Sequence, residues 1–247
     1  MEGGYLHRLG ERRYVSVRKE RSKGDCRLIL LPSSSVSEPE NLTTGSGEDR
    51  LEVSGEVVSG TQYRFGPSRE PLVRIGSASD LNASSFALKG RWFTHSVTFS
   101  YKGWVWEWRY GSRDERMRVG EEIGEGADSL LLLERVGKIG DVGEDGKLKN
   151  GDGEGQRKCV ARLVRGPGSR TVGSKKNSGG NGGRLELCFS SNSQTSSRLW
   201  EEDDGDSLLR GEEDDVGMDE VTVVTTVLAM LKREVDYMRG WQMAAIG

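Results

Sequence analysis

Histidine and cysteine are scarce in this chain, and their scarcity excludes most kinds of catalytic centre. The 247 residues include two histidines, His7 and His95, and three cysteines, Cys26, Cys159 and Cys188. A serine or cysteine hydrolase site would have to use one of the histidines, but one lies in a polar N-terminus and the other in a predicted apolar hairpin. The cysteines are too few and too widely spaced for a disulfide framework or a zinc site. We therefore expect no catalytic residues, no metal and no cofactor.

Long apolar runs and prolines are also lacking. Hydrophobic residues make up 34% of the chain, and no stretch reaches the roughly 18 apolar residues that a membrane-spanning helix needs. The N-terminus has no apolar run typical of a secretory signal, so we expect a cytoplasmic or nuclear protein. Only five prolines accompany 35 glycines. Glycine at this level in a charged chain indicates polar loops around a small core.

Short apolar or alternating runs recur between residues 26 and 189, separated by Gly, Ser and Asp clusters. Each has the length and the β-branched or aromatic content of a strand. These runs are residues 26–31, 51–58, 61–65, 72–75, 85–88, 92–101, 104–110, 129–136, 158–164 and 184–189. No helical periodicity appears among them, so the pattern predicts an antiparallel barrel or sandwich.

The most informative stretch is residues 92–110, which holds eight of the 17 aromatic residues. Lys102-Gly103 is typical of a two-residue hairpin turn, because glycine tolerates a positive φ. That turn sets the register of the two strands. It pairs Tyr101 with Trp104, Phe99 with Trp106, Val97 with Trp108, and His95 with Tyr110. Side chains alternate along a strand, so all eight should lie on one side and face the core.

The C-terminus differs from the rest of the chain. Asp219 can cap a helix, and apolar residues follow it at helical spacing. Residues 221–231 are apolar or Thr at nearly every position, so this half of the helix should be enclosed by the sheets. The fold class we expect is mainly β (α+β), an antiparallel barrel or sandwich with a long hydrophobic C-terminal helix.

The expected organisation is a flexible basic N-terminus over residues 1–25, followed by one β-rich domain over residues 26–246. Three polar or glycine-rich stretches in that domain read as flexible loops, at residues 32–50, 137–156 and 166–183. An acidic segment at residues 201–220 precedes the helix, where negative charge suits a helix N-terminus.

Charge is unevenly distributed along the chain, although its net value is only -3. Residues 154–184 carry eight basic and one acidic side chain, a net charge of +7, and residues 201–220 carry eleven acidic and one basic, a net charge of -10. These segments could attract each other, attract an outside partner, or be solvated loops. The basic stretch supplies a candidate patch for an anionic ligand: Arg157, Lys158, Arg165, Arg170, Lys175 and Lys176.

Many antiparallel strands followed by one mostly apolar C-terminal helix resemble the tubby and phospholipid-scramblase superfamily. The resemblance covers roughly residues 51–246 and rests on residues 221–231 and the hairpin at residues 104–110. It implies a closed barrel around a hydrophobic helix. The chain is also similar to uncharacterised fungal proteins in its Gly-Trp-x-Trp-x-Trp hairpin at residues 103–108 and its Ala-Met-Leu-Lys-Arg-Glu-Val-Asp helix at residues 229–236. Neither resemblance implies an activity or a ligand residue.

These features favour a non-enzymatic binding or scaffold module whose partner is a protein or an anionic lipid. The alternative is a peripheral membrane domain that binds anionic lipid through its basic loops. An enzyme of unrecognised class is the second alternative. The negative net charge argues against nucleic acid as the partner.

Overall fold

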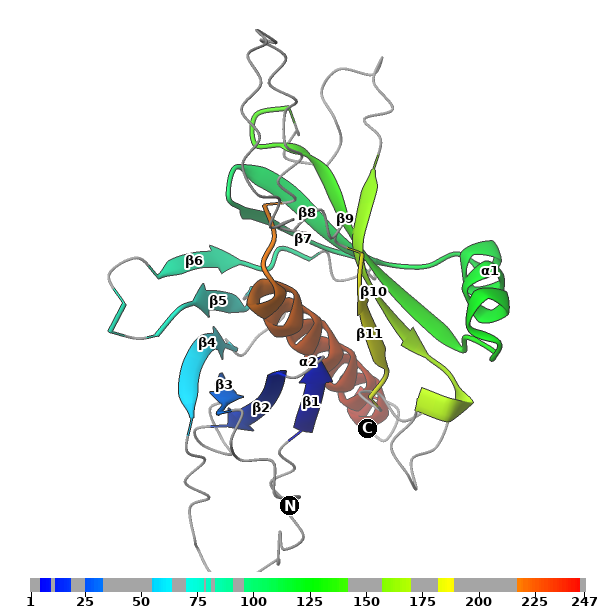
Figure 1. The fold of residues 1–247 in the computed structure, drawn as a ribbon, viewed down its shortest axis with the longest axis horizontal. Helices are drawn as coiled ribbons and strands as arrows, with labels where there is room; N and C mark the ends of the chain where they lie inside the picture. The colour runs from blue at the N-terminus through cyan, green and yellow to red at the C-terminus, as the bar shows by residue number, and fades with distance from the viewer. Residues whose placement is uncertain are drawn as a thin grey trace, which may run out of the picture.

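The computed structural model describes residues 5–9, 12–18, 25–32, 55–63, 70–77, 79–80, 83–90, 96–141, 157–169, 182–188 and 217–244. Over these residues the chain forms two antiparallel sheets and two α-helices. The long C-terminal helix runs between the sheets, and the short helix lies at the outside of one of them (Figure 1). The fold is therefore mainly β, as the sequence predicts.

The first sheet is a meander of six strands in chain order. Its strands are β1 (Tyr5–Leu9), β2 (Arg12–Arg18), β3 (Cys26–Leu31), β4 (Glu56–Gln62), β5 (Leu72–Ile75) and β6 (Ser84–Ala87). Two sequence predictions were wrong here. Residues 5–9 and 12–18 form strands and not a flexible basic N-terminus, and a single strand replaces the two expected at residues 51–58 and 61–65. Tyr14 is fully buried in β2, which explains why this basic segment joins the sheet.

The second sheet has five strands in the order β11-β10-β9-β8-β7. Its strands are β7 (Val97–Tyr101), β8 (Trp104–Tyr110), β9 (Ser129–Lys138), β10 (Lys158–Arg165) and β11 (Arg184–Leu187). One isolated antiparallel bridge, between Lys89 and Thr98, links the end of the first sheet to the start of the second. The described strands make two sheets and no closed barrel, so the sandwich is the better description of the two expected architectures.

The β7–β8 hairpin has the register that its turn predicts. Tyr101 pairs with Trp104, Phe99 with Trp106 and Val97 with Trp108, while His95 lies outside the described residues. The turn residues Lys102 and Gly103 have φ values of 48° and 81°, as a tight hairpin requires. The aromatic side of the hairpin faces the core, and both Trp106 and Trp108 have no exposed surface.

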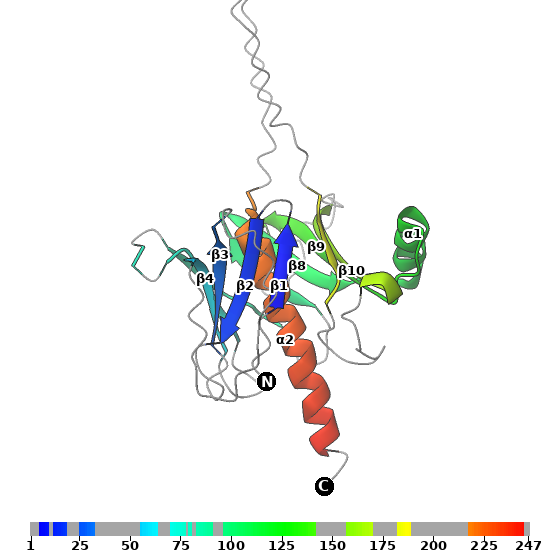
Figure 2. The same ribbon diagram turned by 60° about the horizontal axis from the view of Figure 1, so that its bottom comes forward.

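Helix α2 (Glu220–Ala244) begins where the sequence predicts. Asp219 caps it, because its Oδ1 atom accepts a hydrogen bond from the backbone N–H of Thr222 at 2.8 Å. Val223 and Val227 pack in the main core with residues of β5 to β11, whereas Val224 packs with Tyr14 and Leu28 of the first sheet. Both sheets therefore contact the first half of α2, and its last turns run beyond them (Figure 2).

Helix α1 (Arg113–Ile123) contradicts the expectation that no helix interrupts the strands. A capping box starts it: Ser112 accepts a hydrogen bond from the backbone N–H of Glu115, whose side chain accepts one from the backbone N–H of Ser112. Only Val119 of this helix is buried, against β9 and β10. The apolar stripe is therefore too narrow for hydrophobic periodicity to reveal it.

Candidate anion-binding site

Basic side chains gather around Trp104 at one end of the second sheet. Trp104 pairs with Lys138 and Trp106 pairs with Arg135 across β8 and β9, so Val136 is an extra residue in β9. Such a bulge resets the alternation of side chains along a strand. As a result Arg135 and Lys138 both lie beside the Trp104 ring, although they are three residues apart in the sequence.

The contacts of these two cations are with the indole ring. The Arg135 guanidinium carbon lies 4.2 Å from the ring centroid of Trp104, and the Lys138 Nζ atom lies 5.5 Å from it. Neither side chain is in an ion pair with a carboxylate of the described residues. A cation–π contact positions a cation without neutralising it. Among the residues that the structure describes, these two positive charges therefore have no carboxylate partner.

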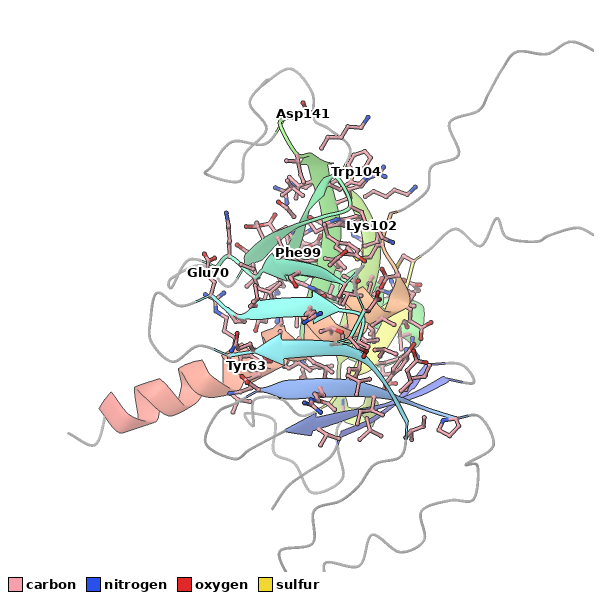
Figure 3. All side chains as sticks on the ribbon, turned by 90° about the vertical axis from the view of Figure 1, so that its left-hand side faces the viewer. Tyr63, Glu70, Phe99, Lys102, Trp104 and Asp141 are labelled. Atoms are coloured by element: carbon pink, nitrogen blue, oxygen red, sulfur yellow. The ribbon has the colours of Figure 1, made fainter. Side chains whose placement is uncertain are left out.

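Two further lysines border this pair of cations. Lys158 faces Arg135 directly across β9 and β10. We call Trp104, Arg135, Lys138 and Lys158 the Trp104 cluster. Lys102, in the hairpin turn, lies at the same end, and its Nζ atom is 3.5 Å from Oδ2 of the helix cap Asp219. Figure 3 shows Trp104 and Lys102 near Asp141 and far from Tyr63.

One acidic group at this end, the helix cap Asp219, is engaged by other partners. The Tyr101 hydroxyl donates a hydrogen bond to Asp219 at 2.7 Å. Burial raises the pKa of Tyr101 to about 12, so the phenol stays protonated as a donor. Burial works against ionisation of Asp219 as well, but hydrogen bonds from Thr222 and Tyr101 lower its pKa overall. Asp219 is thus a charged helix cap, and among the described residues its ion pair is with Lys102.

The structure distributes the described members of the predicted anionic-ligand patch over different places. Lys158 belongs to the Trp104 cluster, whereas Arg157 forms ion pairs with Glu107 and Glu134, at 2.7 and 3.2 Å. Arg165 lies at the far end of β10, about 23 Å away for seven residues of extended chain. The other three predicted residues, Arg170, Lys175 and Lys176, lie outside the described residues.

Charge pairing explains why Arg157 is not part of the cluster. It joins a network on the outer face of the sheet, where Arg109 binds Glu115 and Glu134. Hydrogen bonds from Arg109 hold the pKa of Glu115 at about 2. Each cation of this network is paired with carboxylates, so the network leaves little positive charge for a ligand. The pair between Arg109 and Glu115 also holds α1 against the sheet.

Arg165 is engaged by helix α2. Its guanidinium donates to both carboxylate oxygens of Glu234, at 2.6 and 2.8 Å, and to the Ser129 hydroxyl at 2.9 Å. The Tyr110 hydroxyl donates to the same carboxylate. Burial raises the pKa of Glu234 and lowers that of Arg165, and the two-pronged pairing offsets this penalty. The pair ties the second half of α2 to the second sheet.

We predict that removing one partner of this pair destabilises the protein by about 3 kcal/mol, because it leaves the other charge buried and unpaired. Glu234→Gln and Arg165→Met should each lower the urea midpoint, and the double variant should lose less than the sum of the two. Glu122→Gln is the control, since Glu122 pairs with Arg162 but its side chain is 60% exposed. A double variant whose losses add would show that the two side chains do not stabilise each other.

No family model, curated protein or solved structure matches this chain. Among the described residues, no helix is long and apolar enough to cross a membrane. Within the same residues no three side chains of His, Cys, Asp or Glu are grouped as metal ligands are. In the Trp104 cluster, an indole ring holds two cations side by side. Such an arrangement can attract an anion.

Sequence reasoning missed Arg135 and Lys138. Both lie in a strand that was predicted nearly in full, but their positions have opposite parity, so simple alternation places them on opposite faces. Only the pairing of β8 with β9 shows the extra residue between them. The run Trp-x-Trp-x-Trp in the hairpin identified the ring they contact but gave no signal for the cations.

Proposed function

We propose that this protein is a non-enzymatic binding module that takes an anionic ligand at the Trp104 cluster. The observation that carries the proposal is the pair Arg135 and Lys138, held on one indole ring without carboxylate partners among the described residues. Cations in a folded protein are usually paired or spread out, because like charges repel. Their close placement at the end of a sheet supports a role in recognition.

Anionic lipid headgroups are the ligand that we propose. Trp104 is half-buried and Lys138 is exposed, so the cluster combines an aromatic ring with a cation at the surface of the molecule. Trp rings and basic side chains both favour the interface of an anionic membrane. A cytoplasmic or nuclear protein would meet such lipids on the cytoplasmic leaflet, and that location stays a prediction.

A relation to the tubby and scramblase superfamily stays a prediction. Strands of both sheets pack against the first half of α2, but the described strands do not form the closed barrel that the resemblance implies. The superfamily's closed barrel and its ligand residues are not part of this proposal. The argument for lipid binding rests on the Trp104 cluster alone.

Vesicle sedimentation tests the proposal. Full-length protein should pellet with phosphatidylcholine vesicles that contain 30% phosphatidylserine and not with pure phosphatidylcholine vesicles. Each basic side chain near an anionic surface contributes about 1 kcal/mol. Arg135→Ala/Lys138→Ala should therefore weaken partitioning about 30-fold, and added salt should weaken the binding of the wild type.

The matched control is Arg113→Ala/Arg118→Ala, which removes the same charge from two exposed positions of α1. It should weaken partitioning far less than the cluster variant. If both double variants lost the same amount of vesicle partitioning, the effect would come from net charge alone. The Trp104 cluster would then not be the binding site. Competition by millimolar inorganic phosphate would indicate that the cluster binds free phosphate and not a membrane surface.

A further inference from the structure

Two cysteines lie together on the outer face of the second sheet, although they are far apart in the sequence. Cys159 is the second residue of β10, and Cys188 directly follows the last residue of β11. The backbone N–H of Cys188 donates to the carbonyl oxygen of Val160 at 2.8 Å, so the ladder between the strands extends to this point. The wide spacing of these two cysteines in the sequence therefore does not keep them apart in the fold.

A second bulge brings the two thiols to the same face. Cys159 pairs with Glu134 and Ala161 with Leu133, so Val160 is an extra residue in β10. Val160 and Ala161 are both buried in the main core. Cys159 therefore lies on the opposite, outer face, where it packs with the smaller cluster under α1.

Alternation along β11 gives Cys188 the same orientation. Leu185 and Leu187 pack against the core, and Glu186 pairs with Arg162 on the outer face. Cys188 is the next outer residue after Glu186, and Cys159 is the next outer residue before Arg162. The register of β10 with β11 puts Cys188 opposite Val160, the residue next to Cys159, so the two cysteines are neighbours across the ladder on its outer face.

The two thiols differ in exposure and in acidity. Cys188 is exposed, whereas Cys159 is half-buried. A hydrogen bond between them lowers the pKa of Cys188 to about 7 and raises that of Cys159. The pKa of Cys188 is also lowered by the charge of Arg162, whereas burial and the charges of Glu186 and Glu122 raise it. Burial and the charge of Glu134 further raise the pKa of Cys159. Near neutral pH the exposed sulfur is therefore the more nucleophilic member of the pair.

We infer that Cys159 and Cys188 form a thiol–disulfide exchange site, in which exposed Cys188 attacks and half-buried Cys159 resolves. The co-reactant is a small disulfide such as glutathione disulfide. The Cys188 thiolate attacks one of its sulfurs, which forms a mixed disulfide and releases one glutathione thiolate. Cys159 loses its proton to solvent and attacks the Cys188 sulfur, which releases the second glutathione thiolate. Two protein thiols are oxidised and one small disulfide is reduced to two thiols.

The product would covalently join the edge strand β11 to β10. It would close the chain between residues 159 and 188, and a loop of that size restricts the unfolded state considerably. Oxidation should accordingly raise the Tm by about 10 °C for a chain of this length. Because β11 also contributes Leu185 to the packing around α2, the disulfide would stabilise the enclosure of that helix.

Oxidation of the full chain with glutathione disulfide, followed by non-reducing peptide mass spectrometry, tests the inference. The wild type should give a peptide pair that links Cys159 to Cys188. Cys159→Ser should stop at a glutathione adduct on Cys188, and Cys188→Ser should leave Cys159 as a free thiol. Cys26→Ser is the control and should behave as the wild type does.

Two outcomes would overturn the inference. One is a wild type that accumulates the Cys188 adduct without the internal link, and the other is a link that involves Cys26. The rate of iodoacetamide alkylation supplies an independent measurement on the reduced protein. Its half-maximum at Cys188 should lie near pH 7 in the wild type and move toward the ordinary thiol value of about 8.5 in Cys159→Ala, which removes the hydrogen-bond donor. No movement would show that the thiols are not in contact.

Discussion

Replacing Val223 by aspartate is expected to unfold the protein. Val223 has no exposed surface and packs in the main core, where residues of both sheets surround α2. A carboxyl group at this position must be protonated to stay buried, which costs about 4 kcal/mol at pH 7 for an ordinary pKa near 3.9. The lost apolar contact adds about 2 kcal/mol. Together these approach the entire stability of a typical domain, about 5–15 kcal/mol.

Met117→Asp is the matched control for this experiment, because Met117 also lies on a helix but is 51% exposed. It should leave the far-ultraviolet circular dichroism and the Tm nearly unchanged. The effect of Val223→Asp should also depend on pH. The buried carboxyl has a pKa raised above its unfolded value, so the penalty is absent below pH 4 and grows as the pH rises.

Deletion of residues 219–247 should have the same consequence, because it removes the element that both sheets enclose. Size-exclusion chromatography distinguishes a folded monomer from an unfolded or aggregated chain. A truncated or Val223→Asp protein that stays monomeric and keeps its Tm would show that α2 is an appendage. The core would then have to be formed by the sheets alone.

Much of the second sheet could be predicted because its signals are local. The Lys102-Gly103 turn fixes the register of the hairpin, and alternation then assigns each aromatic residue to a face. The capped apolar start of α2 is likewise visible in a dozen residues. The start or the turn of each of these elements is set by residues within the element itself. Their prediction therefore does not depend on which distant segment they pack against.

The elements that were missed depend on partners far away in the chain. Strand β2 has three arginines among its seven residues, and its buried Tyr14 packs against Val224 of α2. Helix α1 has only one buried residue, although Ser112 and Glu115 form a capping box that the sequence does show. Attention to that motif would have located its first turn.

The candidate sites were missed for a related reason. Both depend on an extra residue in a strand, Val136 in β9 and Val160 in β10, and each bulge moves neighbouring side chains to another face. Bulges are defined by the pairing of two strands, which a count along one strand does not reveal. The predicted basic patch instead relied on charge density, and most of its described cations are engaged by carboxylates.

Truncation of Trp108 is expected to cost about 3–5 kcal/mol, as for large aromatic residues in a core. Trp108 has no exposed surface, and its Nε1–H group donates to the Thr226 hydroxyl of α2 at 3.0 Å. Trp108→Ala therefore removes both the packing volume and the polar contact between hairpin and helix. Urea denaturation should show a lower midpoint with an unchanged slope, since the change acts on the folded state.

Two companion variants separate packing from hydrogen bonding at this position. Thr226→Val keeps the volume but leaves the indole N–H without its acceptor, which should cost about 1–3 kcal/mol. Trp104→Ala removes the same side chain from a half-buried position at the end of the hairpin, so its loss should be clearly smaller than that of Trp108→Ala. If Trp104→Ala and Trp108→Ala lowered the free energy of unfolding equally, the position of Trp108 between sheet and helix would not explain its contribution to stability.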